Sequence, residues 1–237
     1  MTAAACVCYT FFMSKKVVQT QVAYNRPEEL TNIITHAVAA ALSFVGLVFL
    51  MLKTTALGYA PLGIASAFIY GLAMITMFVI STLYHAMPYG SKRRAVFRRL
   101  DHCTISVLIF GTYAPVMLIG MLRGTSADMI WGYTLFAVVS ATAILSVVFN
   151  AINVTKFKVF SLIAYVVMGW ACVIRINRIV ALCGWGCFWF LIGGGLAYSL
   201  GIIFYAIKKI PFNHALWHFF VTAGAALQFV GVYAYLI

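Results

Sequence analysis

Three histidines are the residues of this sequence best suited to chemistry. His214 and His218 stand four apart in PFNHALWHFF (211–220), and His85 ends the run STLYH (81–85). On an α-helix, side chains four apart share a face with Cβ atoms ~6 Å apart, which suits two ligands of one metal ion. Three imidazoles can hold Zn²⁺ and leave its fourth tetrahedral position to water, as in catalytic zinc sites. The spacing therefore predicts a Zn²⁺ centre at His85, His214 and His218, with an incidental HxxxH pair on a helix as the alternative.

Two further residues are placed to assist a metal-bound water. Asp101 is one of only four acidic residues in the chain, and Ser81 lies one helical turn before His85. A carboxylate can accept a proton from water, and a hydroxyl can bond the water or a substrate carbonyl. Asp101 could instead cap a helix or pair with Arg98 and Arg99. Ser81 could instead bond its own helix backbone. We predict catalytic roles for Asp101 and Ser81, with these structural roles as the alternatives.

The elements that carry these residues are expected to span a membrane. The chain has 237 residues, of which 65% are hydrophobic and 8% charged, too apolar for one water-soluble domain. Crossing ~30 Å of hydrocarbon takes ~20 helical residues, and only helices satisfy the backbone in lipid. The apolar runs predict seven spans, at 33–52, 62–84, 104–121, 130–149, 158–175, 184–207 and 213–236.

The predicted fold is an all-α polytopic membrane protein, with a short cytoplasmic segment (1–32) before a seven-helix bundle (33–237). With seven spans, 12 of the 16 lysines and arginines fall on the side of the membrane that carries the N-terminus, and four fall on the opposite side. Cytoplasmic loops carry such an excess, so the N-terminus is predicted inside and the C-terminus outside. We therefore interpret the net charge of +12 as topology rather than nucleic-acid binding. The five cations at 92–99 are expected to meet anionic lipid headgroups.

This orientation brings the candidate site to one membrane depth. The inner ends of the second, third and seventh spans carry His85, Asp101, His102, His214 and His218. Asn213, after Pro211, is expected to cap the last helix. His36 lies about one turn inside the first span, where a polar side chain is costly unless paired. A hydrogen bond to a neighbouring helix, a contact to a metal ligand or substrate, or a direct metal bond are its possible roles. His102 is a candidate for a contact to a ligand or substrate.

Five motifs resemble, in order and spacing, the hemolysin III proteins of the progestin and adipoQ receptor superfamily. They are EELTNIITH (28–36), STLYH (81–85), RRLDHCTISVLIFGTYAP (98–115), GGGLAYSLGIIFYA (193–206) and HALWHFFVTAGAALQF (214–229). The resemblance implies seven helices, an inside N-terminus and a zinc ion near the cytoplasmic face. It implies zinc ligation by the three histidines above, with Asp101 and Ser81 supporting the bound water. The wider clan includes alkaline ceramidases, and bacterial members are named for haemolysis and linked to membrane-lipid homeostasis.

The sequence departs from many members of that family at Gln228, where they carry another histidine. Ten residues separate Gln228 from His218, which is ~15 Å along a helix. Gln228 is therefore not expected to touch the metal.

Three functions agree with these residues. The first is an integral membrane, zinc-dependent hydrolase of a lipid amide or ester, ceramidase-like and linked to lipid homeostasis, with the acyl chain between helices. The alternative is a lipid-sensing or signalling membrane protein in which zinc is structural. A pore-forming haemolysin ranks third, because the spans have almost no ionisable residues at mid-depth. Membrane lipids are the expected partners, and the cell membrane is the expected location.

Overall fold

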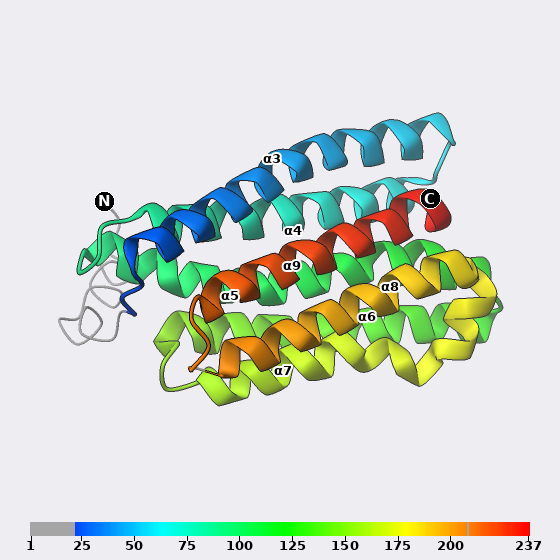
Figure 1. Cartoon of the computed structure of the whole chain (residues 1–237). Helices are drawn as coiled ribbons and strands as arrows, with labels where there is room; N and C mark the ends of the chain where they lie inside the picture. The colour runs from blue at the N-terminus through cyan, green and yellow to red at the C-terminus, as the bar shows by residue number, and fades with distance from the viewer. Residues whose placement is uncertain (1–21, 208) are drawn as a thin grey trace, which may run out of the picture.

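The computed structural model describes residues 22–207 and 209–237, which form a bundle of helices joined by short loops (Figure 1). The predicted all-α class is confirmed for these residues. The first 21 residues of the predicted cytoplasmic segment 1–32 lie outside them. The α-helices are α3 (Arg26–Ala56), α4 (Pro61–Ala86), α5 (Lys92–Pro115), α6 (Ser126–Asn153), α7 (Lys158–Trp170), α8 (Ile176–Ala206) and α9 (Asn213–Val230).

Four short irregular helices continue or connect these elements. After Pro115, which cannot donate a backbone hydrogen bond, α5 continues into the π-helix η1 and the 3₁₀ helix η2. The π-helix η4 extends α9 to the end of the chain, and the 3₁₀ helix η3 joins α7 to α8. Their bounds are η1 (Val116–Gly120), η2 (Met121–Arg123), η3 (Ala171–Arg175) and η4 (Gly231–Leu236).

Six helical stretches of the described chain are long and apolar enough to cross a membrane. The predicted spans 158–175 and 184–207 fall together in one stretch, Lys158–Ala206, of 49 residues. This stretch is interrupted by η3 and by Gly184, whose φ of 82° and ψ of 159° are not helical. In Figure 1 the yellow part of the chain turns back here, so that α7 and α8 run in opposite directions. The bundle is thus shown to be helical and apolar, and the count of seven stays a prediction.

The helix that carries Asp101 begins earlier than predicted. Ser91 is the N-cap of α5, and its Oγ accepts a hydrogen bond from the Arg94 amide at 3.1 Å. Asp101 therefore lies well inside α5 rather than at its start, and its alternative role as an N-cap is wrong. The polar first turns of α5 hid this start, because the span was read from hydropathy alone.

The helix that carries His214 and His218 begins at Asn213 itself. The residue before it, Phe212, has a left-handed backbone with φ of 57°. The Asn213 amide donates its Nδ2 hydrogen to the carbonyl of Tyr205, at the end of α8, at 2.9 Å. The predicted capping role of Asn213 is therefore wrong, and its side chain instead ties the start of α9 to α8.

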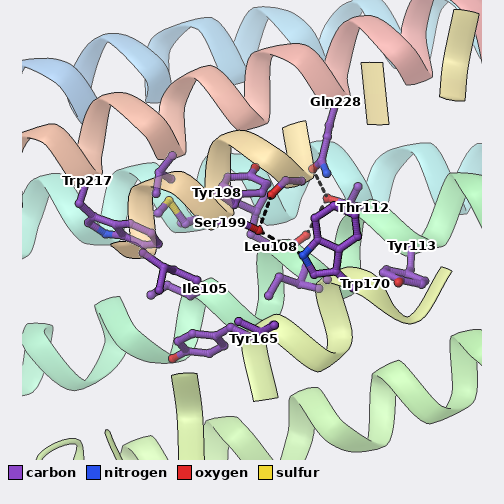
Figure 2. Close-up of a pocket in the computed structure, with 17 residues that line it drawn as sticks. Ile105, Leu108, Thr112, Tyr113, Tyr165, Trp170, Tyr198, Ser199, Trp217 and Gln228 are labelled. Carbon is purple, nitrogen blue, oxygen red and sulfur yellow. Dashed lines mark hydrogen bonds between the residues drawn. The ribbon is translucent and has the colours of Figure 1, made fainter. Parts of the chain in front are cut away.

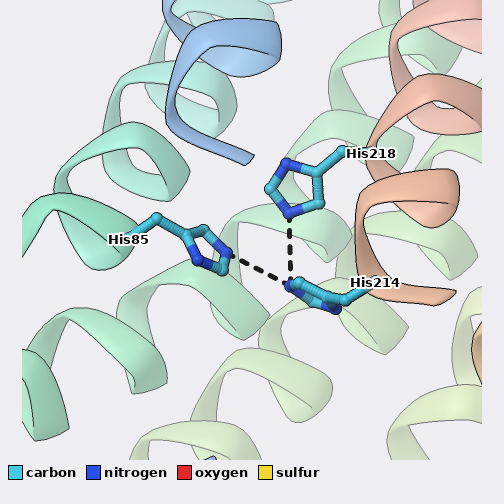
Figure 3. A group of neighbouring side chains, drawn as sticks. All are labelled: His85, His214 and His218. Atoms are coloured by element: carbon cyan, nitrogen blue, oxygen red, sulfur yellow. Dashed lines mark hydrogen bonds between the residues drawn. The ribbon is translucent and has the colours of Figure 1, made fainter. Parts of the chain in front are cut away.

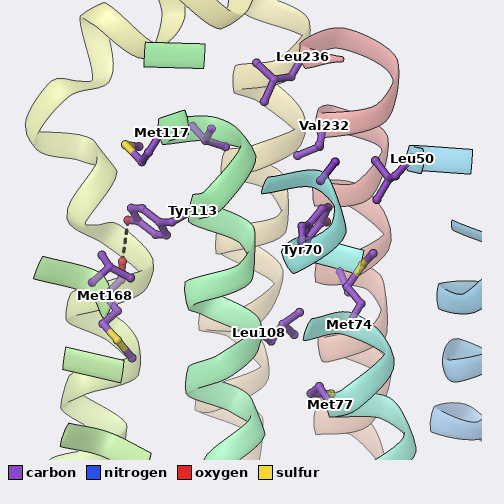
Figure 4. Close-up of a cluster of buried hydrophobic side chains, with 14 of the residues drawn as sticks. Leu50, Tyr70, Met74, Met77, Leu108, Tyr113, Met117, Met168, Val232 and Leu236 are labelled. Atoms are coloured by element: carbon purple, nitrogen blue, oxygen red, sulfur yellow. Dashed lines mark hydrogen bonds between the residues drawn. The ribbon is translucent and has the colours of Figure 1, made fainter. Parts of the chain in front are cut away.

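The apolar core lies between α4, α5 and α9, and continues along η1 and η4 (Figure 4). Tyr70 and Met74 of α4 face Leu108 of α5 and Val232 of η4 there. The Tyr113 hydroxyl donates to the Met168 carbonyl at 2.7 Å and accepts from the Cys172 amide at 2.8 Å. These bonds satisfy backbone groups where α7 ends, and so anchor α7 to α5.

At the far end of the bundle from His85, a cluster of polar side chains links the helix ends. Asp128 is buried at the start of α6, and its carboxylate accepts from Arg178 Nε at 2.8 Å and from Arg178 Nη2 at 2.6 Å. Lys53 Nζ donates to the Tyr233 carbonyl at 2.6 Å, and Arg123 Nη2 donates to the Leu236 carbonyl at 2.9 Å. Cations near a helix C-terminus stabilise its unpaired carbonyls. The basic residues of this end thus contact the protein itself.

Close contact between α4 and α5 depends on Gly111. A Cβ atom at this position would lie 2.4 Å from Cβ of Ala73, whereas at Gly169 it would meet no atom within 4 Å. Overpacking typically costs about 1–3 kcal/mol, while alanine otherwise favours a helix over glycine by ~1 kcal/mol. We expect Gly111→Ala to lower the unfolding temperature in detergent and the control Gly169→Ala to leave it unchanged or raise it. Equal unfolding temperatures for the Gly111→Ala and Gly169→Ala variants would contradict the close contact.

Candidate metal centre

The three histidines predicted as ligands converge on one point (Figure 3). His85 comes from the last turn of α4, and His214 and His218 come from the first turns of α9. The Nε2 atom of His214 lies 3.1 Å from Nε2 of His85 and 3.2 Å from Nε2 of His218. One ligand atom from each of the three lies within 4.8 Å of the others. Their exposed fractions are 3%, 6% and 1%, so the cluster is shielded from water.

Hydrogen bonds alone do not account for this arrangement. A ring nitrogen of neutral histidine offers either one proton or one in-plane lone pair, yet Nε2 of His214 has two imidazole nitrogens beside it. A cation in the middle would use all three lone pairs at once. Bonds of ~2.0–2.1 Å to a tetrahedral zinc place ligand atoms ~3.3–3.4 Å apart, close to these separations. The cluster could therefore hold a metal ion, and its all-nitrogen donors suit Zn²⁺.

A carboxylate that the sequence interpretation missed contacts His85. Glu29 Oε2 lies 2.6 Å from Nδ1 of His85, the ring nitrogen on the side away from the cluster. Glu29 Oε1 pairs with Arg94 Nη2, and Arg94 Nη1 donates to the Met87 carbonyl at 2.8 Å. The motif EELTNIITH contains Glu29, but nothing in the sequence shows which helix it would meet.

Arg94 and Arg99 correct the prediction that all five cations at 92–99 meet lipid headgroups. Their exposed fractions are only 2% and 6%. Arg94 pairs with Glu29, and Arg99 Nη1 donates to the Ala151 carbonyl at 3.3 Å. Each is held by partners outside α5, because α5 begins at Lys92, before the predicted span 104–121, and turns one face to the bundle.

Two more residues from the start of the described chain touch His214. Glu28 is buried, and its Oε1 accepts a hydrogen bond from the His214 backbone amide at 3.3 Å. The ring of Tyr24 stacks on the His214 imidazole, with centroids 4.6 Å apart and planes at 15°. Burial, with nearby phenols and carboxylates, raises the pKa of Tyr24 above its usual value, so its hydroxyl keeps its proton. Tyr24 lies outside the spans, and no sequence motif marked it.

Asp101 and His102 both face a cavity that reaches the cluster. The cavity has a volume of about 60 Å³ and is lined by Asp101, His102, Tyr165, Tyr205 and His214, among others. This volume can hold water molecules. His102 Nδ1 lies 2.9 Å from the Arg98 carbonyl and 3.7 Å from Asp101 Oδ2. The structure thus brings the predicted base to the same cavity as one predicted ligand, with His102 beside it.

Ser81 and His36 are both buried, and His36 contacts the cluster. Ser81 is buried on α4 one turn before His85. His36 of α3 stacks on His218 with ring centroids 3.7 Å apart and planes at 18°, and its edge meets Phe78. Neither ring nitrogen of His36 has a hydrogen-bond partner among the described residues. The hydrogen bond to a neighbouring helix predicted for His36 is therefore not found, and the ring packs against a ligand instead.

A second cavity continues from the first toward the other end of the bundle (Figure 2). Its volume is about 80 Å³, and it shares Ile105, Tyr165, Ile202 and Trp217 with the Asp101 cavity. Its wall is apolar except at a few places, including Gln228, whose Oε1 lies 3.5 Å from Thr112 Oγ1. Gln228 therefore faces this cavity and not the imidazoles, as its distance along α9 predicted.

Comparison with known proteins decides the family. The family model described as "Haemolysin-III related" matches residues 24–229. This chain belongs to the haemolysin-III-related family. It is 39% identical over 210 residues to the "Hemolysin-3 homolog" of Bacillus subtilis (strain 168), covering 89% of this chain and 95% of that protein. It is 38% identical over 211 residues to "Hemolysin-3" of Bacillus cereus, covering 89% and 92%.

The family extends to mammals. The haemolysin-III-related chain is 29% identical over 182 residues to the human "Monocyte to macrophage differentiation factor", covering 72% of this chain and 70% of that protein. The predicted family is confirmed by these matches. With its six apolar helical stretches, this member of the family is an integral, multi-pass protein of the cell membrane.

Proposed function

We propose that this haemolysin-III-related protein is a zinc-dependent hydrolase of an amide or ester bond in a membrane lipid. The observation that carries the proposal is the meeting of His85, His214 and His218 beside a cavity that Asp101 also lines. Three neutral ligands and a nearby carboxylate are the composition of a hydrolytic zinc site. The zinc ion is part of the proposal, and the three histidines are the residues that would hold it.

Each residue has a stated role in this proposal. Bound zinc would lower the pKa of a water toward ~7 and polarise a carbonyl. Asp101, facing the cavity, would accept the proton of the attacking water and pass it to the leaving nitrogen or oxygen. The Ser81 hydroxyl would donate a hydrogen bond to the carbonyl oxygen as negative charge develops there. The phenol of Tyr24 would help to exclude bulk water from this face of His214.

The placement of the protein in the membrane is part of the same proposal. We infer seven spans, with α7 and the part of α8 after Gly184 as separate crossings, and a cytoplasmic N-terminus. Supporting this are the reversal of the chain between α7 and α8 (Figure 1) and the excess of basic residues near the metal centre. An acyl chain would then enter between helices toward the apolar cavity of Figure 2 while the bond to be cut lies near His214.

Lipid turnover by the purified protein tests the proposal. Vesicles containing N-acyl sphingoid and O-acyl glycerol lipids are incubated with the zinc-loaded protein, and released fatty acid is measured by mass spectrometry. We expect release that stops after chelation and returns with Zn²⁺. Full zinc content without release from any of these lipids would refute the hydrolase. It would favour a lipid-sensing protein with structural zinc, whereas ion conductance in lipid bilayers would favour a pore.

A further inference from the structure

The first turn of α3 supplies no metal ligand, yet it contacts two of the helix ends that carry ligands. We propose that Glu28 and Glu29, here named the carboxylate clip, position His85 and His214, so that metal affinity is set by an element outside the ligand set. The inference rests on the metal centre of the proposed function but not on turnover. In this role Glu28 and Glu29 are positioning residues, because neither is among the residues that would bind the ion.

Glu29 fixes the tautomer and the orientation of His85. With Oε2 2.6 Å from Nδ1, the carboxylate favours a proton on Nδ1 and leaves the lone pair on Nε2, the atom that faces the cluster. Carboxylates that accept the second ring N–H of a metal-bound histidine raise its basicity, and their loss typically costs 10–100-fold in metal affinity. The hydrogen bond also restrains rotation of the ring, which favours a preformed site.

Arg94 holds the Glu29 carboxylate in place. A carboxylate in partly buried surroundings needs a counter-charge, and Arg94 Nη2 pairs with Glu29 Oε1. The same guanidinium lies over the Tyr84 ring, 4.9 Å from its centroid, and donates through Nη1 to the Met87 carbonyl at the end of α4. Arg94 therefore binds the helix that carries His85 as well as the carboxylate that orients it.

Glu28 acts on the other ligand-bearing helix. Its Oε1 accepts from the backbone amide of His214 at 3.3 Å, in the first turn of α9, where amide groups lack partners within the helix. A carboxylate there also interacts favourably with the helix dipole. Asn25 holds the clip at its own end, because its Oδ1 accepts from the Glu28 amide at 2.8 Å.

The adjacency of the two glutamates explains how one turn reaches three helices. Neighbouring residues on an α-helix point ~100° apart, since 3.6 residues complete a turn. Glu29 thereby reaches α4 and α5 while Glu28 reaches α9. The separation between His85 and His214, and with it the size of the metal cage, depends on where α3 holds both ends.

Zinc affinity of the full-length protein in detergent tests the clip. Glu29→Gln keeps the size of the side chain but removes its charge and turns an amide toward either Arg94 or His85. We expect it to weaken Zn²⁺ binding 10–100-fold in competition with a chelator, and to alter the visible absorption spectrum of the Co²⁺-substituted protein. Glu28→Ala should weaken binding by several-fold. Asp128→Asn is the matched control, because it removes a buried, arginine-paired acid at the other end of the bundle.

The outcomes separate positioning from general destabilisation. Wild-type Zn²⁺ affinity and Co²⁺ spectrum in Glu29→Gln would overturn the proposal, and so would an equal loss of affinity in Asp128→Asn. If Glu29→Gln does not purify folded, Glu29→Asp, which keeps the charge but is shorter, is expected to show an intermediate loss, and wild-type affinity there would overturn the clip. Zinc affinity needs no substrate, so a wild type that binds zinc but releases no lipid refutes the hydrolase while leaving the clip standing.

Discussion

Alanine in place of His85, His214 or His218 is expected to lower the zinc content of the purified protein about 10-fold or more. Each variant leaves two imidazoles in a buried cage whose ring nitrogens lie 3.1 and 3.2 Å apart in the intact cluster. Two neutral ligands hold Zn²⁺ far less well than three, because zinc favours four-coordination and water must take the vacated position. Elemental analysis after purification at defined zinc concentration measures the effect.

Gln228→Ala is the matched control for this series. Gln228 lies on the same helix as His214 and His218 but lines the cavity of Figure 2 instead of the cluster. Its removal is expected to leave the zinc content unchanged. If all four variants bind as much zinc as the wild type, the histidines do not form the metal site. The carboxylate clip would then have no metal ligands to position.

The meeting of the three histidines could be predicted from the sequence because helical periodicity is local. His214 and His218 share a face wherever an α-helix includes both, and the orientation predicted from the lysines and arginines placed His85 at the same predicted depth. Asp101 reached the cavity beside His214 for the same reason. None of these inferences needed to know which helices are neighbours.

The supporting residues could not be predicted because their roles depend on contacts between distant segments. Glu29 meets His85 and Arg94 across 56 and 65 residues of chain, and Glu28 meets His214 across 186. Composition misassigned Arg94 to lipid headgroups, since a basic run beside an apolar span usually lies there. An arginine with 2% exposure is instead explained by its carboxylate.

The start of α5 was predicted wrongly for a related reason. Hydropathy locates the part of a helix that lies in hydrocarbon, whereas α5 begins at Lys92 with a Ser91 cap and a polar first turn. At Gly184 the sequence and the structure agree, because the predicted span 184–207 begins at the residue whose positive φ interrupts α8. Polar helix ends are therefore where the spans read from sequence differ most from the structure.

Asp101→Asn is expected to reduce lipid turnover by ~10²–10⁴-fold while zinc is retained. The amide cannot accept the proton of the attacking water, but the three histidines are unchanged. Asp101 is not among the residues of the histidine cluster and faces the cavity it shares with His214, so its loss should separate chemistry from metal binding. Fatty-acid release and elemental analysis on the same preparation measure both.

Asp128→Asn again serves as the control, because it removes an acid from the other end of the bundle and should leave turnover per zinc-loaded molecule unaltered. Turnover in Asp101→Asn equal to that of the wild type would show that another group takes the proton. Within the cavity His102 is then the next candidate, since its ring lies 3.7 Å from the same carboxylate. Zinc loss in Asp101→Asn would instead place Asp101 among the groups that hold the metal, and the proposed division between ligands and base would be wrong.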